Sequence, residues 1–329
     1  MSITFTPLTF DELKANWSTY QKSFTAPHPF VLPEWLDAWW GSFGGGEELY
    51  LRAVILEGET IGIAPLRLKD GITRFIGSAD VCDYLDFVLK PGAEAEFFAG
   101  LLNELKKSGV RFLDLESLRP DSTVLKYLVP LARSKSFRIE NVDTDVTLEM
   151  PLPAGWDEYL AGLSTHQRHE IGRKGRRLNE GGRIQFDIKP PTDIDADTDL
   201  STLLRLLRAS RADKADFMTE AMETYFKRLS RAMHEAGLLR FGHLSLDDKA
   251  VASVMCFDYN GVRYLYNSGY DPDYSLQSVG LLSKVYSIKD AIDQKMTKYD
   301  FLKGAEVYKY HLGGREMPIS RCRIELSGD

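Results

Sequence analysis

The sequence is poor in the residues and patterns that mark several kinds of site. It holds three cysteines, Cys82, Cys256 and Cys322, which lie far apart without metal-ligand spacing, so neither a disulfide framework nor a zinc site is predicted. The six histidines form no His-x-x-x-His or glutamate-flanked pattern, and no Gly-x-Ser-x-Gly elbow or Walker loop occurs. Metal catalysis therefore finds no support in the sequence.

Long apolar runs are also missing. No run approaches the roughly 18–20 residues of a membrane-spanning helix, and the N-terminus has no basic region followed by an apolar stretch. We therefore expect a cytoplasmic protein without a signal peptide or a transmembrane segment. The net charge of −7 argues against a DNA-binding role for the whole molecule, and the acidic excess lies in residues 1–152.

The length of 329 residues predicts about two domains, and Pro151 and Pro153 mark a boundary between residues 1–152 and 153–329. Helical and strand patterns alternate, which predicts a mixed α/β fold. In the first half we expect helices at 33–43, 94–108 and 121–135 and strands at 49–56, 60–68, 73–76, 110–115 and 137–149. In the second half we expect helices at 155–162, 164–179, 199–212, 218–236 and 279–294 and strands at 183–188, 238–246, 250–259, 262–270 and 298–303.

An internal repeat relates the two halves. Residues 51–78 align with residues 241–268 at an offset of 190, and each copy is strand, turn, strand, turn, strand, followed by a helix and another strand. With the offset shortened to 186, Asp114-Leu115 meets Asp300-Phe301. The identities are few, but the shared order of elements favours duplication over two unrelated meanders.

The copies differ after the third strand, where the second half carries Gln277-Ser278-Val279-Gly280-Leu281 at the start of a helix. A Gln-x-x-Gly loop there can present free backbone N–H groups, and both the glycine and the helix dipole favour an anion. This segment is our candidate donor-binding loop.

Around this loop the sequence resembles a known family. The run Gly-Tyr-Asp-Pro-x-Tyr (269–274), then Gly-Leu-Leu (280–282), then Tyr-Asp-Phe-Leu-x-Gly-x-Glu-x-Tyr-Lys (299–309) resembles the GNAT-like acetyltransferases of the CelD/BcsL group, which are similar to Fem-type aminoacyl ligases. Matching first-half segments are 33–36, 62–66, 83–86 and 113–115, so the resemblance covers roughly residues 25–312. It implies tandem GNAT-like domains with the donor site in the second. Leu282 stands where the family's loop usually has a small residue, which brings ordinary coenzyme A binding into question.

Acyl transfer needs groups that carry a proton and stabilise an oxyanion. The catalytic candidates are Asp300, Glu306, Lys309 and Tyr266; Tyr270 is a further proton carrier. Each also has a structural explanation: a strand-end cap for Asp300, half-buried strand positions for the tyrosines, and a surface ion pair for Glu306 and Lys309.

A basic helix is the second candidate feature. Ser164-x-x-Gln167 is a capping box, and residues 165–183 hold six Lys and Arg against two Glu. Arg173, Arg176 and Arg177 share a face, which His169 extends by a turn. With Arg168, these arginines are our candidates for binding the phosphates of an acceptor, a carrier or a tRNA; a solvated basic face is the alternative.

The leading hypothesis is an acyltransferase that uses acetyl-CoA or another acyl-CoA and no metal. The resemblance implies a polysaccharide, nucleotide sugar or envelope precursor as acceptor, and hence exopolysaccharide biosynthesis. The alternatives are a Fem-type ligase that takes its donor from aminoacyl-tRNA, and a non-catalytic GNAT scaffold.

Overall fold

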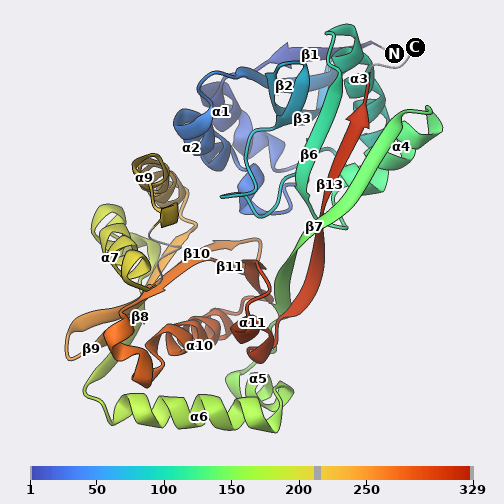
Figure 1. Cartoon of the computed structure of the whole chain (residues 1–329). Helices are drawn as coiled ribbons and strands as arrows, with labels where there is room; N and C mark the ends of the chain where they lie inside the picture. The colour runs from blue at the N-terminus through green and yellow to red at the C-terminus, as the bar shows by residue number, and fades with distance from the viewer. Residues whose placement is uncertain (1, 211–215, 327–329) are drawn as a thin grey trace. The chain divides into compact units, whose positions relative to one another are not determined.

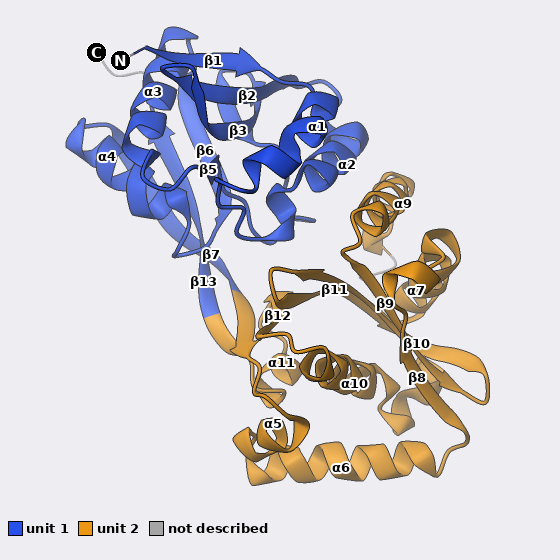
Figure 2. Cartoon of the chain, turned by 180° about the vertical axis from the view of Figure 1, so that it is seen from behind, with its two compact units in different colours: residues 1–146, 317–329 blue, residues 147–316 orange. Residues whose placement is uncertain are grey.

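The computed structural model describes residues 2–210 and 216–326, which form two compact units. Unit 1 comprises Met1–Val146 and Met317–Asp329, and unit 2 comprises Thr147–Glu316 (Figure 2). The division along the chain thus falls a few residues before the predicted boundary, and the C-terminal segment clusters with the first unit.

Unit 1 is built on a mixed sheet covered by helices (Figure 1). Its strands lie in the order β1-β2-β3-β4-β6-β13, and β5 pairs with β3. The strands are β1 (Ile3–Pro7), β2 (Glu48–Leu56), β3 (Glu59–Lys69), β4 (Ile72–Phe75), β5 (Val88–Leu89), β6 (Phe112–Leu118) and β13 (Arg315–Glu325). The helices are α1 (Phe10–Tyr20), η1 (Pro29–Val31), α2 (Pro33–Phe43), α3 (Glu94–Lys107), η2 (Val124–Leu128) and α4 (Val129–Ser134).

In unit 2 the strands lie in the order β7-β12-β11-β10-β9-β8. Its strands are β7 (Arg138–Pro151), which begins in unit 1, β8 (Ile184–Ile188), β9 (Leu239–Leu246), β10 (Lys249–Tyr259), β11 (Val262–Tyr270) and β12 (Lys298–Lys303). Its helices are α5 (Trp156–Gly162), α6 (Thr165–Asn179), η3 (Pro191–Asp193), α7 (Ala196–Ser210), α9 (Glu220–Glu235), η4 (Pro272–Gln277), α10 (Val279–Asp293) and α11 (Val307–His311). The last two positions of the helix predicted at 199–212 lie outside the described residues.

The predicted repeat in the order of elements is confirmed. The antiparallel meander β2-β3-β4 of unit 1 corresponds to β9-β10-β11 of unit 2, and β3 and β10 are related by the offset of 190. In each unit a helix, α3 or α10, then leads to a strand that pairs in parallel with the last meander strand, β4 with β6 and β11 with β12. The mixed α/β fold is confirmed as well.

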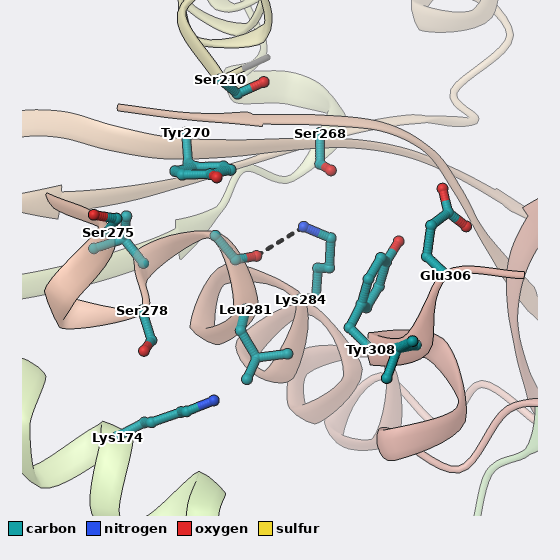
Figure 3. Close-up of a pocket in the computed structure, with 13 residues that line it drawn as sticks. Lys174, Ser210, Ser268, Tyr270, Ser275, Ser278, Leu281, Lys284, Glu306 and Tyr308 are labelled. Carbon is teal, nitrogen blue, oxygen red and sulfur yellow. Dashed lines mark hydrogen bonds between the residues drawn. The ribbon is translucent and has the colours of Figure 1, made fainter. Parts of the chain in front are cut away.

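The parallel pairing in unit 2 is short, and this positions the site. Strands β11 and β12 pair only from Val262↔Lys298 to Tyr264↔Asp300, although β11 continues to Tyr270. A register shift between Asp300 and Leu302 then bends β12 along its other neighbour, β7. The strands part beyond this point, and the first turn of α10 lies beside the free part of β11 (Figure 3).

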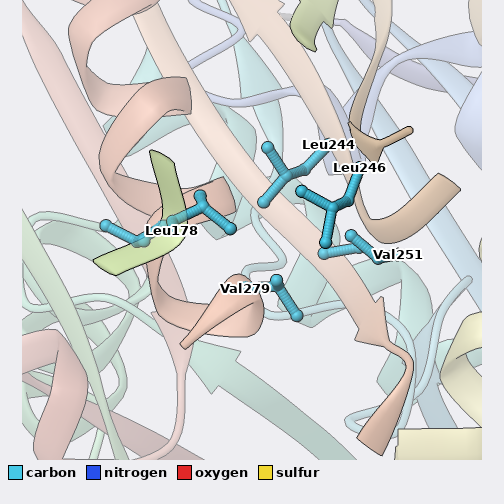
Figure 4. Close-up of a cluster of buried hydrophobic side chains, with 7 residues drawn as sticks. Leu178, Leu244, Leu246, Val251 and Val279 are labelled. Carbon is cyan, nitrogen blue, oxygen red and sulfur yellow. The ribbon is translucent and has the colours of Figure 1, made fainter. Parts of the chain in front are cut away.

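A buried cluster fixes the start of α10 and the end of α6 against the sheet. It joins Leu178 of α6, Leu244 and Leu246 of β9, Val251 of β10 and Val279 of α10, each no more than 5% exposed (Figure 4). Burying a side chain of this size contributes roughly 1.5–3 kcal/mol. The two helices that flank the site therefore have a rigid support.

Candidate active site

A pocket of about 490 Å³ lies in unit 2 beside the first turn of α10 (Figure 3). Four elements carry most of its lining: α10, the end of β11, α11, and α6 on the opposite side. The lining residues are Lys174, Ser210, Ser268, Tyr270, Ser275, Ser278, Val279, Gly280, Leu281, Lys284, Glu306, Val307 and Tyr308.

The start of α10 leaves two backbone donors available. Ser278 adopts a left-handed conformation, with φ of 57°, and its carbonyl accepts from the N–H groups of Leu281 and Leu282 at 3.1 and 3.0 Å. Across the described residues, no acceptor is found for the N–H groups of Val279 and Gly280. Together with the helix dipole, they suit the binding of an anion.

Two lysines add positive charge to this part of the pocket. Lys284 lies one turn along α10 and is only 7% exposed, and its ammonium donates to the Gly280 carbonyl at 2.7 Å. The same ammonium lies 5.0 Å from the centre of the Tyr308 ring. Lys174 reaches the pocket from α6 (Figure 3). Both charges lie where an anion bound at the helix start would be stabilised.

Gly280 serves a packing role in addition to its place in the predicted loop. A Cβ at this position would lie 2.8 Å from the ring of Tyr270, so the glycine lets that ring lie against the helix. Gly269 plays a similar part on the other side of β11, where a Cβ would lie 2.3 Å from the backbone nitrogen of Leu207 in α7. These close approaches fix the β11 wall of the pocket.

The other members of the predicted donor loop divide between pocket and core. Ser278, Val279, Gly280 and Leu281 line the pocket, whereas Gln277 does not, and its side-chain oxygen is buried without a hydrogen-bond partner among the described residues. Leu282 is 1% exposed and belongs to the buried cluster. Its size therefore does not obstruct the donor site, and the sequence-based doubt about coenzyme A loses its physical basis.

Helix α11 brings a phenol and a carboxylate to the pocket. Burial, reinforced by the nearby carboxylate of Glu306, raises the pKa of Tyr308, so the phenol stays protonated at neutral pH. Glu306 lines the same pocket and forms an ion pair with Lys309 at 2.9 Å. A protonated phenol beside a carboxylate can serve as proton donor and proton acceptor.

The remaining predicted catalytic residues lie outside the pocket lining. Asp300 is 1% exposed, and one of its oxygens accepts from the N–H of Leu302 at 2.8 Å, which stabilises the bulge in β12. Tyr266 packs against Phe226 and Phe257. Lys309 is buried, and its ammonium donates to the carbonyls of Leu302, Lys303 and Gly304, a set that holds the turn after β12.

The predicted capping box of α6 is present, because the Ser164 hydroxyl accepts from the Gln167 N–H and the Gln167 side chain accepts from the Ser164 N–H. The basic residues of this helix then serve different roles. Arg168 donates to carbonyls at the end of α5, and Arg173 forms a bidentate pair with Glu170. Arg176 and Arg177 are exposed to solvent.

Lys174, Lys284 and Tyr308 were not among the residues predicted from the sequence. Tyr308 stands inside the Glu-x-Tyr-Lys motif, between the two residues that were chosen. Lys284 lies four residues after Gly280, so helical periodicity could have placed it on the same face. The pattern of the sequence alone could not show that α6 brings Lys174 to the pocket.

The sequence and fold were compared with known proteins. Residues 165–310 match the model of the Acetyltransf_6 family, described as an acetyltransferase (GNAT) domain. This segment is a GNAT-like acetyltransferase domain. The match contains the whole lining of the pocket, and the prediction of a GNAT-like acyltransferase is confirmed at this level. No curated protein matches the sequence.

Solved structures share the fold over the full chain at low identity. The crystal structure of FemX has a TM-score of 0.65 at 13% identity, covering 98% of this chain and 97% of that one. A tandem GNAT protein from the clavulanic acid biosynthesis pathway has a TM-score of 0.52 at 12% identity, covering 100% of both chains. L-PGS from Bacillus licheniformis has a TM-score of 0.54 at 10% identity, covering 92% and 93%. The predicted tandem GNAT-like fold is thus confirmed.

The described residues contain neither a metal-binding cluster nor a membrane-spanning helix. No group of three or more His, Cys, Asp or Glu side chains in that part of the chain is arranged to hold a metal ion. The helices there are all too short or too polar to cross a membrane.

Proposed function

We propose that unit 2 transfers an acyl group from coenzyme A to an amine or hydroxyl acceptor. The observation that carries the proposal is the pocket at the parted strands β11 and β12, where two free N–H groups, Lys174 and Lys284 surround the helix start. The phosphates of coenzyme A would bind there, and its acyl arm would lie along β11 toward Tyr308.

The residues of α11 supply the proton transfers. As the acceptor attacks the thioester carbonyl, Glu306 takes the proton from the attacking amine or hydroxyl. The new carbon–nitrogen or carbon–oxygen bond forms, the carbon–sulfur bond breaks, and Tyr308 gives its proton to the departing thiolate. Asp300 and Lys309 act as positioning residues, since they hold the bulge and the turn from which α11 starts.

The class of acceptor is proposed from the sequence resemblance and from the exposed arginines of α6. The resemblance to the CelD/BcsL group favours a cytoplasmic step on a polysaccharide, nucleotide sugar or envelope precursor, as in exopolysaccharide biosynthesis. The exposed Arg176 and Arg177 would meet the phosphates of such an acceptor, while Arg168 and Arg173 hold α6 in place.

A Fem-type ligase remains the second candidate, favoured by the fold similarity to FemX and by the basic face of α6. Its donor would be an aminoacyl-tRNA whose phosphates bind that face, with an affinity that falls steeply as salt is added. The two candidates therefore differ in donor and in salt dependence.

The test is calorimetric binding of acetyl-CoA and of aminoacyl-tRNA to the full chain. We expect acetyl-CoA to bind. Leu281→Glu should weaken this binding by about tenfold or more, because a carboxylate then faces the phosphates. Gln294→Glu, which adds the same charge at the far end of α10, should leave binding unchanged. Binding of aminoacyl-tRNA in place of acetyl-CoA would favour the ligase, and binding of neither would favour a scaffold.

A further inference from the structure

The outer face of α6 carries a basic stripe. His166, His169, Arg173, Arg176 and Arg177 are all exposed, and their spacing along the helix places them on one side. Arg173 is partly neutralised by Glu170, but for Arg176 and Arg177 no acidic partner is found among the described residues. We name these five side chains the α6 stripe.

Exposed aliphatic side chains lie close to the same pocket. Leu276 is 67% exposed and lies in η4. Ser275, directly before it, and Ser278, two residues after it, both line the pocket. Val307 is 65% exposed and lines it from α11. Among the described residues of unit 2, these two are the large hydrophobic side chains with high exposure. Leu276 is thus near the end of α6, where Gly181 approaches the Gln277 side chain.

The stripe and the pocket are connected through α6 itself. Lys174, which lines the pocket, lies between Arg173 and Arg176 in the helix. Basic charge therefore runs from Lys174 in the pocket lining round to the outer face of α6. Val307 lines the same pocket, and Leu276 lies in η4 next to the lining residue Ser275.

We propose that this surface docks on an anionic phospholipid bilayer. Basic side chains attract the negative leaflet, and aliphatic side chains at the same surface enter the headgroup region. A nucleic acid would suit the charge, but unspecific nucleic-acid surfaces stack bases on aromatic rings, whereas Leu276 and Val307 are aliphatic. The proposed association is peripheral, through side chains at the protein surface.

The inference rests on the proposed function in one respect, namely the class of acceptor. A pocket that opens at a membrane surface would act on an acceptor carried by a lipid, presented from the bilayer beside Val307. The docking surface itself needs no catalytic activity and can be tested without it.

The experiment is co-sedimentation of the full chain with vesicles of phosphatidylcholine alone and with vesicles that also contain phosphatidylglycerol. We expect binding to the anionic vesicles only, weakened by added salt. Arg176→Glu/Arg177→Glu should reduce partitioning by about tenfold or more. Lys227→Glu/Arg228→Glu, the same charge change on exposed positions of α9, should not.

The aliphatic part has its own pair of variants. Leu276→Ser should reduce partitioning by about threefold, and Val142→Ser, at a 44% exposed position in unit 1, should leave it unchanged. Unchanged melting temperatures would show that each variant is folded. No binding to anionic vesicles, equal loss in the α9 control, or binding of poly(U) RNA without vesicle binding would overturn the inference.

Acetyl-CoA calorimetry on the same samples separates the two proposals. Vesicle binding without acetyl-CoA binding would leave the docking surface standing and refute the proposed donor. Acetyl-CoA binding without vesicle binding would refute the docking surface alone.

Discussion

The two units share one order of elements but use the space beyond their parallel strands differently. In unit 2, the pocket lies between the end of β11, the first turn of α10 and α11. In unit 1, the chain after β4 folds back into the corresponding region. Leu85 donates its N–H to the Ser117 carbonyl at 3.0 Å, and the Ser117 hydroxyl donates to the Cys82 carbonyl at 2.9 Å.

The segment after β4 also contacts the elements of unit 1 that correspond to the other walls of the pocket in unit 2. Phe87 packs against Phe97 and Phe98 in the first turns of α3, with ring centres 5.4 Å apart in both pairs. Asp86 accepts from the backbone and hydroxyl of Thr123, just before η2. The framework therefore keeps a pocket of about 490 Å³ in unit 2, whereas in unit 1 the chain itself occupies the corresponding region.

The largest expected difference between the units concerns equivalent strand positions. Arg263 of β11 is 1% exposed and pairs with Asp258 and Asp290. At the offset of 190, the corresponding residue of β4 is Thr73. The buried hydroxyl of Thr73 has no hydrogen-bond partner among the described residues. Arg263→Met should cost about 3–5 kcal/mol, because it removes the bidentate pair with the buried Asp258, which then keeps only Arg240, and the pair with the half-buried Asp290. Thr73→Val should be neutral or stabilising by about 1 kcal/mol.

Urea unfolding, followed by hydrogen exchange in each unit, measures both effects. Similar costs for the two substitutions would contradict the view that charge pairing supports only the second unit at this position.

The stability of unit 1 should also depend on pH differently from the stability of unit 2. Burial raises the pKa of Asp86 to about 6, against the opposing hydrogen bonds from Thr123 and Phe87. Because the folded state binds this proton more tightly than the unfolded state, the contribution of Asp86 to stability is present below about pH 4. It is lost as the pH rises through about 6, a change of about 3 kcal/mol.

Asp199 of unit 2 should behave in the opposite way. Burial alone would raise its pKa, but hydrogen bonds from His243 and Lys189 outweigh that effect and lower it. Its contribution is therefore present above about pH 4 and lost on acidification. Hydrogen exchange of β4–β6 between acid and neutral pH should show the Asp86 trend, which Asp86→Asn should flatten; an unchanged trend in that variant would refute the assignment.

Catalysis should depend on the α11 phenol and not on the matching position of unit 1. Tyr308→Phe should lower kcat by about 100-fold, because it removes the proposed proton donor. The measurement is thiol release from acetyl-CoA with amino-sugar acceptors. Tyr310→Phe, in the same helix, and Ser122→Ala, at the equivalent place in unit 1, should retain activity. Equal loss in Tyr310→Phe would mean that α11 is merely sensitive to substitution.

Local patterns predicted the framework well. The strands predicted at 49–56 and 60–68 form a hairpin whose turn residues, Glu57 and Gly58, have φ of 50° and 89°, and the predicted capping box lies at the start of α6. The C-terminal strand β13 was not predicted, because its place is set by distant pairing with β6. A strand that pairs with a segment far away along the chain leaves no local signal in the sequence.

The site was predicted less completely than the fold, for a similar reason. Of the donor loop predicted at 277–281, residues 278–281 line the pocket, because free N–H groups at a helix start follow from local sequence; its role in binding a donor stays a prediction. The roles of Lys309 and Asp300 could not, since only the bulge in β12 turns the carbonyls of 302–304 toward the lysine. Lys284 and Tyr308 meet across the pocket only because β12 parts from β11.

The smallest expected effect tests whether α6 contributes to the open site. The ammonium of Lys174 lies 3.8 Å from Glu170, and its side chain is 26% exposed, so solvent screens its attraction for a bound phosphate. Lys174→Met should therefore weaken acetyl-CoA binding only about threefold to fivefold, as measured by calorimetry. Lys289→Met on α10 and Lys90→Met, close before α3 in unit 1, should leave binding unchanged, since neither lines the pocket. If Lys90→Met weakened binding as much as Lys174→Met, the donor would also have to bind to unit 1. The two units would then not differ in donor binding.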